Sequence, residues 1–168
     1  CIDGCDVHVL FDLLDYMRRK AEEKFNRDAC QEYIKRLGAF AKIEIIELKD
    51  EKVPDNYSDK EIRKAVGRES SRILARLGSG PAIALDLNGD MPDSVQFSEQ
   101  IAGMMQNGSS TIDYIIGGSN GLSPEVLSAC SRKISFSRMT FPHQLFRVML
   151  LEQLYRAFKI MRGGTYHK

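Results

Sequence analysis

The apolar positions of this 168-residue chain follow two different spacings. Four-residue steps predict a helix from about Asp12 to Leu37, where Gly38 provides a stop. A capping box at Ser58–Glu61, and further caps and helical spacing, predict helices at about 58–77, 94–107, 124–131 and 142–161. Runs of β-branched residues predict strands at 7–11, 43–48, 82–87, 111–116 and 134–137, with a turn at Asn88-Gly89 after the third. Strands that alternate with helices predict an α/β fold, with a mostly parallel sheet and helices on both faces.

Length and composition indicate a single domain, residues 1–168, with 43% hydrophobic and 28% charged residues. No apolar run reaches the roughly 18 residues of a membrane span. The N-terminus lacks the layout of a signal peptide, so we expect a cytoplasmic protein. The four cysteines do not have the spacing of a zinc site, and we expect no bound metal and reduced thiols.

The last predicted helix is apolar on nearly every side. Such a helix needs burial on more than one side, and the sheet of so small a chain is expected to cover one. We therefore expect a second copy of the chain on the other side, in a two-fold homodimer. The alternative is a helix buried at the centre of one chain. On this helix, Glu152 and Arg156 are spaced to form an ion pair.

The net charge of +1 is unevenly distributed. Residues 132–168 contain eight lysines and arginines but one acid, Glu152, and carry +7, whereas the preceding 131 residues carry −6. A basic C-terminal segment on a nearly neutral protein is typical of a localised contact with a polyanion. Solvated basic side chains without a partner would give the same count.

Two loops that each follow a strand are the candidate binding elements. Gly117–Gly121 follows the strand at 111–116, and Phe136–Phe141 leads into the last helix. Glycine permits close approach of the backbone to a ligand, and α/β sheets bind ligands at the carboxyl ends of their strands. The glycine loop by itself is equally consistent with a tight turn. At the ends of neighbouring strands, the two loops could hold a flat, mostly neutral ligand through backbone N–H and C=O groups. The motifs of serine hydrolases, phosphate loops, dinucleotide folds and zinc proteases are absent.

Several C-terminal motifs resemble those of one family. They are Ile115–Leu122 (IIGGSNGL), Ser135–Gln144 (SFSRMTFPHQ), Glu152–Gly163 (EQLYRAFKIMRG) and Tyr166–Lys168 (YHK). These stretches are similar to the RlmH family, SPOUT-class methyltransferases that methylate N3 of a pseudouridine in large-subunit (23S) ribosomal RNA. The resemblance covers roughly residues 20–168. Residues 1–20 are atypical, because the expected Gly-Lys turn after the first strand is missing.

The resemblance implies a C-terminal trefoil knot, S-adenosylmethionine as cofactor, and a homodimer in which the C-terminal tail reaches toward the partner's pocket. It places cofactor contacts on Leu85, Gly117, Gly118, Gly121, Phe136, Ser137, Arg138, Met139, Thr140 and Phe141. It also implies that Tyr166, His167 and Lys168 of this tail help to form the RNA site. From their charge we expect phosphate contacts at Arg138, Arg156, Lys159, Arg162 and Lys168.

The implied chemistry is methyl transfer to a ring nitrogen, which requires positioning and loss of the N3 proton. Nearby cations or bases would favour the anion, and the candidates are His143, Arg147, Arg156 and His167. The sequence does not single out one of them as the base. Two other functions remain open: an RNA- or ribosome-binding protein on the same fold without catalysis, and a methyltransferase of another RNA such as transfer RNA.

Overall fold

The computed structural model describes residues 6–13, 20–49, 58–118 and 121–164. Its five strands are β1 (Asp6–Leu13), β2 (Lys42–Lys49), β3 (Ala82–Asp90), β4 (Thr111–Ile116) and β5 (Arg132–Ile134). They form one sheet in the order β2-β1-β4-β3-β5, and every pair is parallel. The predicted α/β fold with a parallel sheet is therefore confirmed. The trefoil knot stays a prediction.

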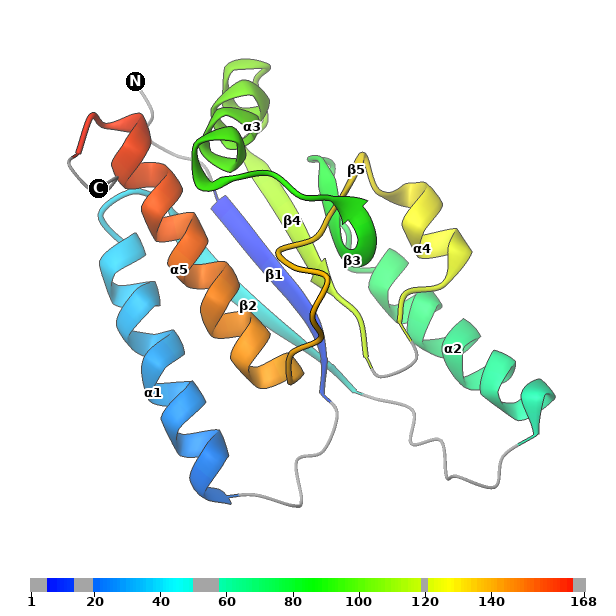
Figure 1. The fold of residues 1–168 in the computed structure, drawn as a ribbon. Helices are drawn as coiled ribbons and strands as arrows, with labels where there is room; N and C mark the ends of the chain where they lie inside the picture. The colour runs from blue at the N-terminus through cyan, green and yellow to red at the C-terminus, as the bar shows by residue number, and fades with distance from the viewer. Residues whose placement is uncertain (1–5, 14–19, 50–57, 119–120, 165–168) are drawn as a thin grey trace.

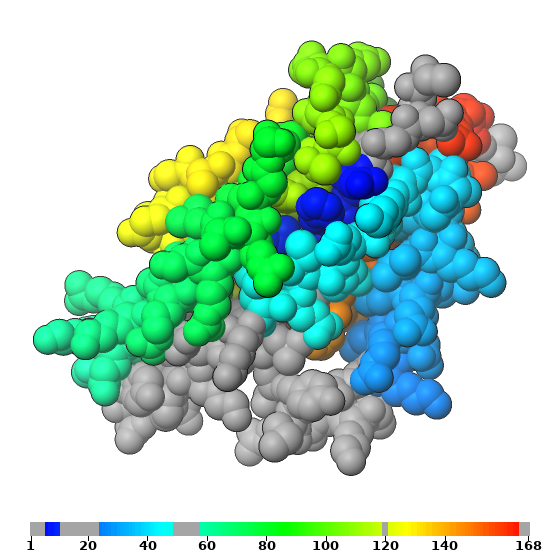
Figure 2. All heavy atoms as spheres, turned by 180° about the vertical axis from the view of Figure 1, so that it is seen from behind, coloured from blue at the N-terminus to red at the C-terminus, as the bar shows by residue number. Residues whose placement is uncertain are grey.

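The helices are α1 (Lys20–Leu37), α2 (Asp59–Leu74), α3 (Ser94–Gln106), α4 (Pro124–Ala129) and α5 (His143–Met161). Figure 1 shows α1, α3 and α5 on one face of the sheet and α2 and α4 on the other. The view from behind in Figure 2 shows α2 and α4 over the β3 side, while atoms of β1 and β2 reach the surface beside them. No helix in the described ranges is long and apolar enough to cross a membrane.

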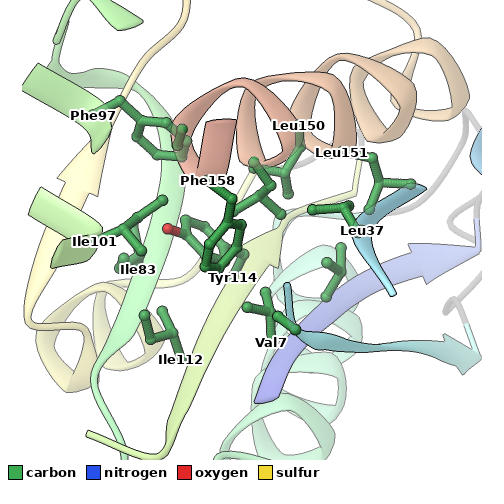
Figure 3. Packing of buried hydrophobic residues seen from close by; sticks show 14 of the residues in the cluster. Val7, Leu37, Ile83, Phe97, Ile101, Ile112, Tyr114, Leu150, Leu151 and Phe158 are labelled. Atoms are coloured by element: carbon green, nitrogen blue, oxygen red, sulfur yellow. The ribbon is translucent and has the colours of Figure 1, made fainter. Parts of the chain in front are cut away.

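The main core lies between the sheet and helices α1, α3 and α5. Alternate residues of β4, Ile112 and Tyr114, point toward this face and are fully buried, and Ile115 faces the smaller core under α2 and α4. Figure 3 shows Leu150, Leu151 and other α5 side chains meeting those of the strands. Helix α5 thus contributes several of the buried side chains that form the main core.

Helix α5 has more neighbours within its own chain than its sequence indicated. It packs against both α1 and α3 as well as the sheet, and buries Arg147, Leu150, Leu151, Leu154, Ala157 and Phe158. The sheet was expected to cover one side of this helix, and in the structure α1 and α3 also flank it. The homodimer stays a prediction, but the apolar sequence of α5 no longer requires one.

Three predicted boundaries are corrected by pairing between strands. Asp12 and Leu13 belong to β1, which pairs with β2 and β4, and α1 begins at Lys20. Asn88-Gly89 continues β3 because Gly89 lies against β5; a Cβ there would be 2.6 Å from Ile134 N. Strand β5 spans Arg132–Ile134, so the predicted strand at 134–137 begins too late.

Helices α2 and α4 end a few residues earlier than predicted, at Leu74 and Ala129.

The predicted starts of α2, α3 and α4 agree with the structure. The Ser58–Glu61 capping box is present, and the side chain of Asp93 accepts a hydrogen bond from Gln96 N at 2.8 Å. Ser123 accepts from Val126 N at 3.3 Å, with Pro124 in the first turn. These caps are local hydrogen bonds, so the sequence alone locates them.

Candidate functional site

A cavity of about 670 Å³ lies at the carboxyl ends of β3, β4 and β5. Its volume is within the roughly 300–1,000 Å³ of small-molecule sites. Its walls come from the ends of the three strands, the loops that follow them, α4 and the start of α5. The lining residues are Leu85, Asp86, Leu87, Asn88, Ile116, Gly117, Gly118, Gly121, Leu122, Leu127, Ile134, Ser135, Ser137, Met139, Thr140, Phe141, His143 and Phe146.

The loop after β4 requires glycine at two positions. A Cβ on Gly117 would lie 2.9 Å from Leu122 Cγ and 3.1 Å from the carbonyl carbon of Gly121. Gly121 has a φ of +72° and donates its N–H to Gly118 O at 3.0 Å. The loop therefore folds back on itself so closely that its backbone, not side chains, forms this wall of the cavity.

The loop after β5 is held by its serines. Ser135 N donates to Asp90 O at 2.8 Å, which ties the loop to the end of β3. The Ser135 hydroxyl donates to Ser137 O at 2.8 Å, and the Ser137 hydroxyl accepts from Met139 N at 3.0 Å. These bonds bend the chain directly after Ile134 and account for the early end of β5. The second wall of the cavity is thus fixed before any ligand binds.

The cavity carries little charge. Among the described residues, no lysine or arginine lines it, and its ionisable side chains are Asp86 and His143. Asp86 accepts a hydrogen bond from Asn88 N at 2.9 Å. Most of the remaining lining is apolar or glycine backbone. Because phosphate groups require cations or clustered N–H donors, this lining favours a neutral or cationic ligand with a flat apolar part.

Most of the predicted cofactor residues come together here. Leu85, Gly117, Gly118, Gly121, Ser137, Met139, Thr140 and Phe141 all line the cavity. Phe136 does not, because its ring packs 5.9 Å from that of Phe97 and 5.3 Å from that of Phe146. Arg138 is also not among the lining residues. As contacts to a bound cofactor, all of these assignments stay predictions.

Sequence reasoning missed several lining residues. They are Asp86, Leu87, Asn88, Ile116, Leu122, Leu127, Ile134, Ser135 and Phe146. Residues 86–88 could have been predicted, because they follow Leu85 at the carboxyl end of β3. The turn expected at Asn88-Gly89 instead placed them outside the predicted pocket. No pattern in the sequence indicated Leu127 or Phe146, which reach the cavity only through the packing of α4 and α5.

The fold places the four candidate cations and bases in different surroundings. His143, the first residue of α5, lines the cavity. Arg147 is buried, its Nη1 lies 3.5 Å from Glu47 Oε1, and burial lowers the pKa of its guanidinium. Arg156 pairs with Glu152, with 2.7 Å between Nη2 and Oε1, so that predicted ion pair is confirmed. His167 lies outside the described residues.

Apart from Arg138, which lies between the lining residues Ser137 and Met139, the predicted RNA-contacting residues that the structure describes lie away from the cavity. Lys159 and Arg162 lie at the far end of α5, and Arg156 lies one turn before them. Eighteen residue steps of helix separate the two ends by about 27 Å. Tyr166, His167 and Lys168 lie outside the described residues, as do Cys1 and Cys5.

Comparison with known proteins identifies the family. Residues 16–167 match the model of the family described as "Predicted SPOUT methyltransferase", so the chain belongs to the SPOUT methyltransferase family. The methyl donor of this family, S-adenosylmethionine, is the cofactor. The RlmH resemblance is narrower than this match and belongs to the proposal below.

Solved structures of similar proteins include the SpoU methyltransferase AviRb from Streptomyces viridochromogenes in complex with AdoMet, at 17% identity and a TM-score of 0.46. That match covers 96% of this chain and 60% of AviRb, so the chain spans less than two thirds of that protein. The A. aeolicus TrmH/SpoU tRNA modifying enzyme is similar at 13% identity and a TM-score of 0.43, with 96% of this chain and 80% of that chain covered.

The lining residues fit S-adenosylmethionine. The donor carries a flat adenine and a cationic sulfonium, and the cavity offers apolar side chains, close-approaching glycine backbone and the carboxyl group of Asp86 without an opposing lysine or arginine among the described residues. A cation is favoured near a carboxylate and disfavoured near other cations.

Proposed function

We propose that this protein is an RNA methyltransferase that transfers a methyl group from S-adenosylmethionine to N3 of a pseudouridine in large-subunit ribosomal RNA. The observation that carries the proposal is the cavity between the Gly117–Gly121 loop and the serine-held loop after β5. Membership of the SPOUT family supports methyl transfer. The C-terminal motifs shared with the RlmH family support the nucleotide, and the basic C-terminal segment supports an RNA substrate.

The donor would be held mainly by backbone. Gly117 and Gly118 allow the main chain to approach its flat ring, and Leu122 and Phe141 supply apolar walls. Asp86 would favour the sulfonium over the neutral sulfide that remains after transfer. When bound, the cofactor would supply an electrophilic methyl group.

Of the four candidates, His143 lines the cavity, and we propose that it accepts the proton from N3. In this step the imidazole accepts the proton from N3 while the ring nitrogen forms its bond to the methyl carbon and the bond from carbon to sulfur breaks. Arg147, one helical turn further along α5, does not line the cavity and pairs with Glu47, so we assign it no proton or charge in this step. The acting unit in this proposal is a homodimer working on assembled ribosomal particles.

Two measurements test the function. Isothermal titration calorimetry is expected to show binding of S-adenosylmethionine. If no binding is detected at millimolar donor, the proposed enzymatic function is refuted. Transfer of labelled methyl groups is then compared on intact ribosomes, naked ribosomal RNA and transfer RNA, with the ribosome expected to be the best acceptor. Donor binding without transfer to any of the three would favour a non-catalytic RNA-binding protein, and preference for transfer RNA would refute the proposed substrate.

A matched pair of variants tests His143. His143→Gln is expected to lower kcat at least about 100-fold, a typical share of general-base catalysis, with the donor affinity changed less than threefold. Gln144→Ala, at the next position of α5, is the control and should keep its rate. A His143→Gln variant with wild-type kcat between pH 6 and 9 would exclude the assigned role.

A further inference from the structure

Helix α2 presents a row of cations to solvent on the face of the sheet that does not carry α5. The four cations are all exposed, and we call them the α2 basic face: Lys60, Arg63, Lys64 and Arg68. Figure 2 shows α2 at the surface beside α4. Because α2 and α5 lie on opposite faces of the sheet, as Figure 1 shows, the second copy of the chain expected on α5 would leave this row uncovered.

The spacing of these residues places their side chains on one side of the helix. Lys60, Lys64 and Arg68 follow one another at steps of four residues, and Arg63 is the neighbour of Lys64 in the same turn. With a rise of 1.5 Å per residue, a step of four residues advances about 6 Å along the helix axis. One face of α2 can therefore contact several phosphates of one nucleic-acid backbone at the same time.

The acids of α2 do not neutralise this row. Asp59 and Glu61 lie in the first turn, where the helix N-terminus favours negative charge, and Glu61 accepts hydrogen bonds from the N–H and hydroxyl of Ser58. Glu69, the third acid of the helix, is buried. Beyond the first turn, every exposed charged side chain of α2 is a cation. A positive face thus occurs within the first 131 residues, which together carry −6.

Small residues form a low floor between the cations. Gly67 is exposed in the middle of the helix, and a Cβ there would have no atom within 4 Å, so packing does not require glycine at this position. Glycine in a helix interior destabilises the helix relative to alanine. The hydroxyl of Ser71, one turn later, donates to Gly67 O at 2.9 Å and so stays close to the helix. A ligand backbone can therefore approach the helix closely while Arg63 and Arg68 extend beside it.

The chemistry of this face suits a paired nucleic acid. Helix α2 contains no aromatic residue, so it has no platform on which unpaired bases could stack. Cations without aromatic neighbours contact the sugar–phosphate backbone, which fixes a protein on a double helix without reading its bases. Double-stranded RNA is recognised mostly in this way, by its shape and its backbone.

Helix α2 lies beside an element that lines the cavity. Ile73 of α2 and Val126 of α4 belong to the same small core, and Leu127, the next residue of α4, lines the cavity. Helix α2 also connects β2 to β3, so it begins toward the sheet edge at which the strands end, as Figure 1 shows. The cavity lies at that edge, and the α2 basic face is therefore beside it on the α4 side.

We propose that the α2 basic face binds the sugar–phosphate backbone of a paired segment of the RNA substrate, next to the unpaired nucleotide that enters the cavity. The inference rests on the proposed function, because it takes RNA as the substrate. Arg63, Lys64 and Arg68 contact phosphates, and Gly67 lets one strand lie close to the helix. Such contacts carry no sequence information, so this face positions an RNA helix and leaves the choice of nucleotide to the cavity.

Fluorescence anisotropy with two labelled probes tests the charge of this face. The probes are an RNA duplex of about 20 base pairs with mixed sequence and an oligouridylate of about 20 nucleotides. Arg63→Gln/Lys64→Gln is expected to bind the duplex at least about tenfold more weakly at low salt, with oligouridylate binding changed less than about threefold. The plot of log affinity for the duplex against log salt should be shallower by about 1.8, because each lost phosphate contact on a double helix removes about 0.9.

The matched control exchanges the two residues and keeps their charges. Arg63→Lys/Lys64→Arg retains both cations on the same turn of α2, so its duplex affinity and salt slope should equal those of the wild type. Thermal unfolding of both double variants checks that the helix is intact. Loss of duplex binding in the control as well would show that charge on this face is not what binds the RNA.

A variant at Gly67 separates the shape of the face from its charge. Gly67→Leu places a large side chain on the floor, and leucine is the better helix former, so the midpoint of thermal unfolding should rise. Duplex affinity should nevertheless fall about tenfold with an unchanged salt slope, because the added side chain holds the strand away from the helix while every cation remains. A more stable variant with wild-type duplex affinity would show that no strand lies on this floor.

Methyl transfer to ribosomes connects the face to the reaction. Arg63→Gln/Lys64→Gln should raise KM and keep kcat, as expected for the loss of uniform binding, and should bind S-adenosylmethionine like the wild type. Wild-type KM and duplex affinity in this variant would refute the α2 contact alone, provided that the wild type binds the donor and transfers methyl groups. If the wild type does neither, the proposed function fails independently of α2. A change of mass in sedimentation would instead assign the face to a protein contact and overturn the inference.

Discussion

The two ends of α5 lie on the same helix but carry opposite chemistry. At its start, His143 and Phe146 face a cavity built mostly from apolar side chains and glycine backbone. At its end, Lys159 and Arg162 lie among aromatic rings at the surface. A single rigid element thus presents a nearly uncharged enclosure at one end and a cationic platform at the other.

The difference teaches how one small domain can handle two dissimilar ligands. A small donor needs an enclosing, shaped site, and backbone supplies shape without long side chains. A polyanion needs charge and flat faces spread over a surface, which long side chains supply. The buried middle of α5, where Leu150 and Leu151 are fully enclosed, keeps the two ends at a fixed separation.

The largest effect is expected from the middle of the helix. Leu151→Ala removes a fully buried side chain and should lower the free energy of unfolding by about 2–5 kcal/mol, measured by urea denaturation. Both binding activities should then weaken together on warming, since both ends depend on the same core. Leu145→Ala, at a side chain that is 37% exposed, is the control with an expected loss below about 1 kcal/mol. Independent loss of the two activities in Leu151→Ala would mean that α5 does not couple them.

A substitution at the cavity should weaken donor binding without changing RNA binding. Gly117→Val places a branched side chain where a single Cβ already lies 2.9 Å from Leu122 Cγ, and should weaken S-adenosylmethionine binding about 100-fold, or about 2.7 kcal/mol. Titration calorimetry measures this loss. Fluorescence anisotropy with a labelled oligouridylate should show that RNA binding changes less than twofold. The control is Gly103→Ala, where no atom lies within 4 Å of the added Cβ. Retained donor affinity in Gly117→Val would place the donor elsewhere.

The smallest effect is expected on the opposite face of the sheet, away from both ends. The hydroxyl and N–H of Ser58 donate to the carboxylate of Glu61 and lower its pKa. A lowered pKa in the folded state adds stability above the unfolded value of about 4.3 and loses it as pH falls through the folded pKa. Glu61→Gln should therefore be slightly less stable than wild type at pH 7, and the difference should vanish toward pH 3.

Thermal unfolding at both pH values measures this difference. Donor binding at pH 7 should be unchanged in Glu61→Gln, because no residue of α2 lines the cavity. A difference that grows at acid pH would show that the carboxylate is not stabilised by its cap.

Local signals in the chain were sufficient for much of the fold. The caps at Ser58, Asp93 and Ser123 act within four residues, so the helix starts followed from sequence. Strand β4 was predicted at its observed bounds because its apolar run is bounded by polar residues. The glycine loop and the loop after β5 were expected to share a pocket because parallel strands end at one edge, and both line the cavity.

The errors occur where distant segments override a local pattern. Leu13 fits a four-residue helical spacing, yet its pairing with Lys49 of β2 places it in β1. Phe136 lies in the predicted cofactor loop, yet its ring packs against those of Phe97 and Phe146 and is half-buried there.

The sequence by itself determined the parallel α/β class, the helix caps and the two loops of the cavity, because these depend on periodicity, on turn chemistry and on the common direction of parallel strands. Only the tertiary structure decided which neighbours cover α5, which side chains complete the cavity, and that Arg162 lies over the ring of Phe40. Such contacts join residues far apart in the chain, and they form only when packing a shared core repays the entropy of closing long loops.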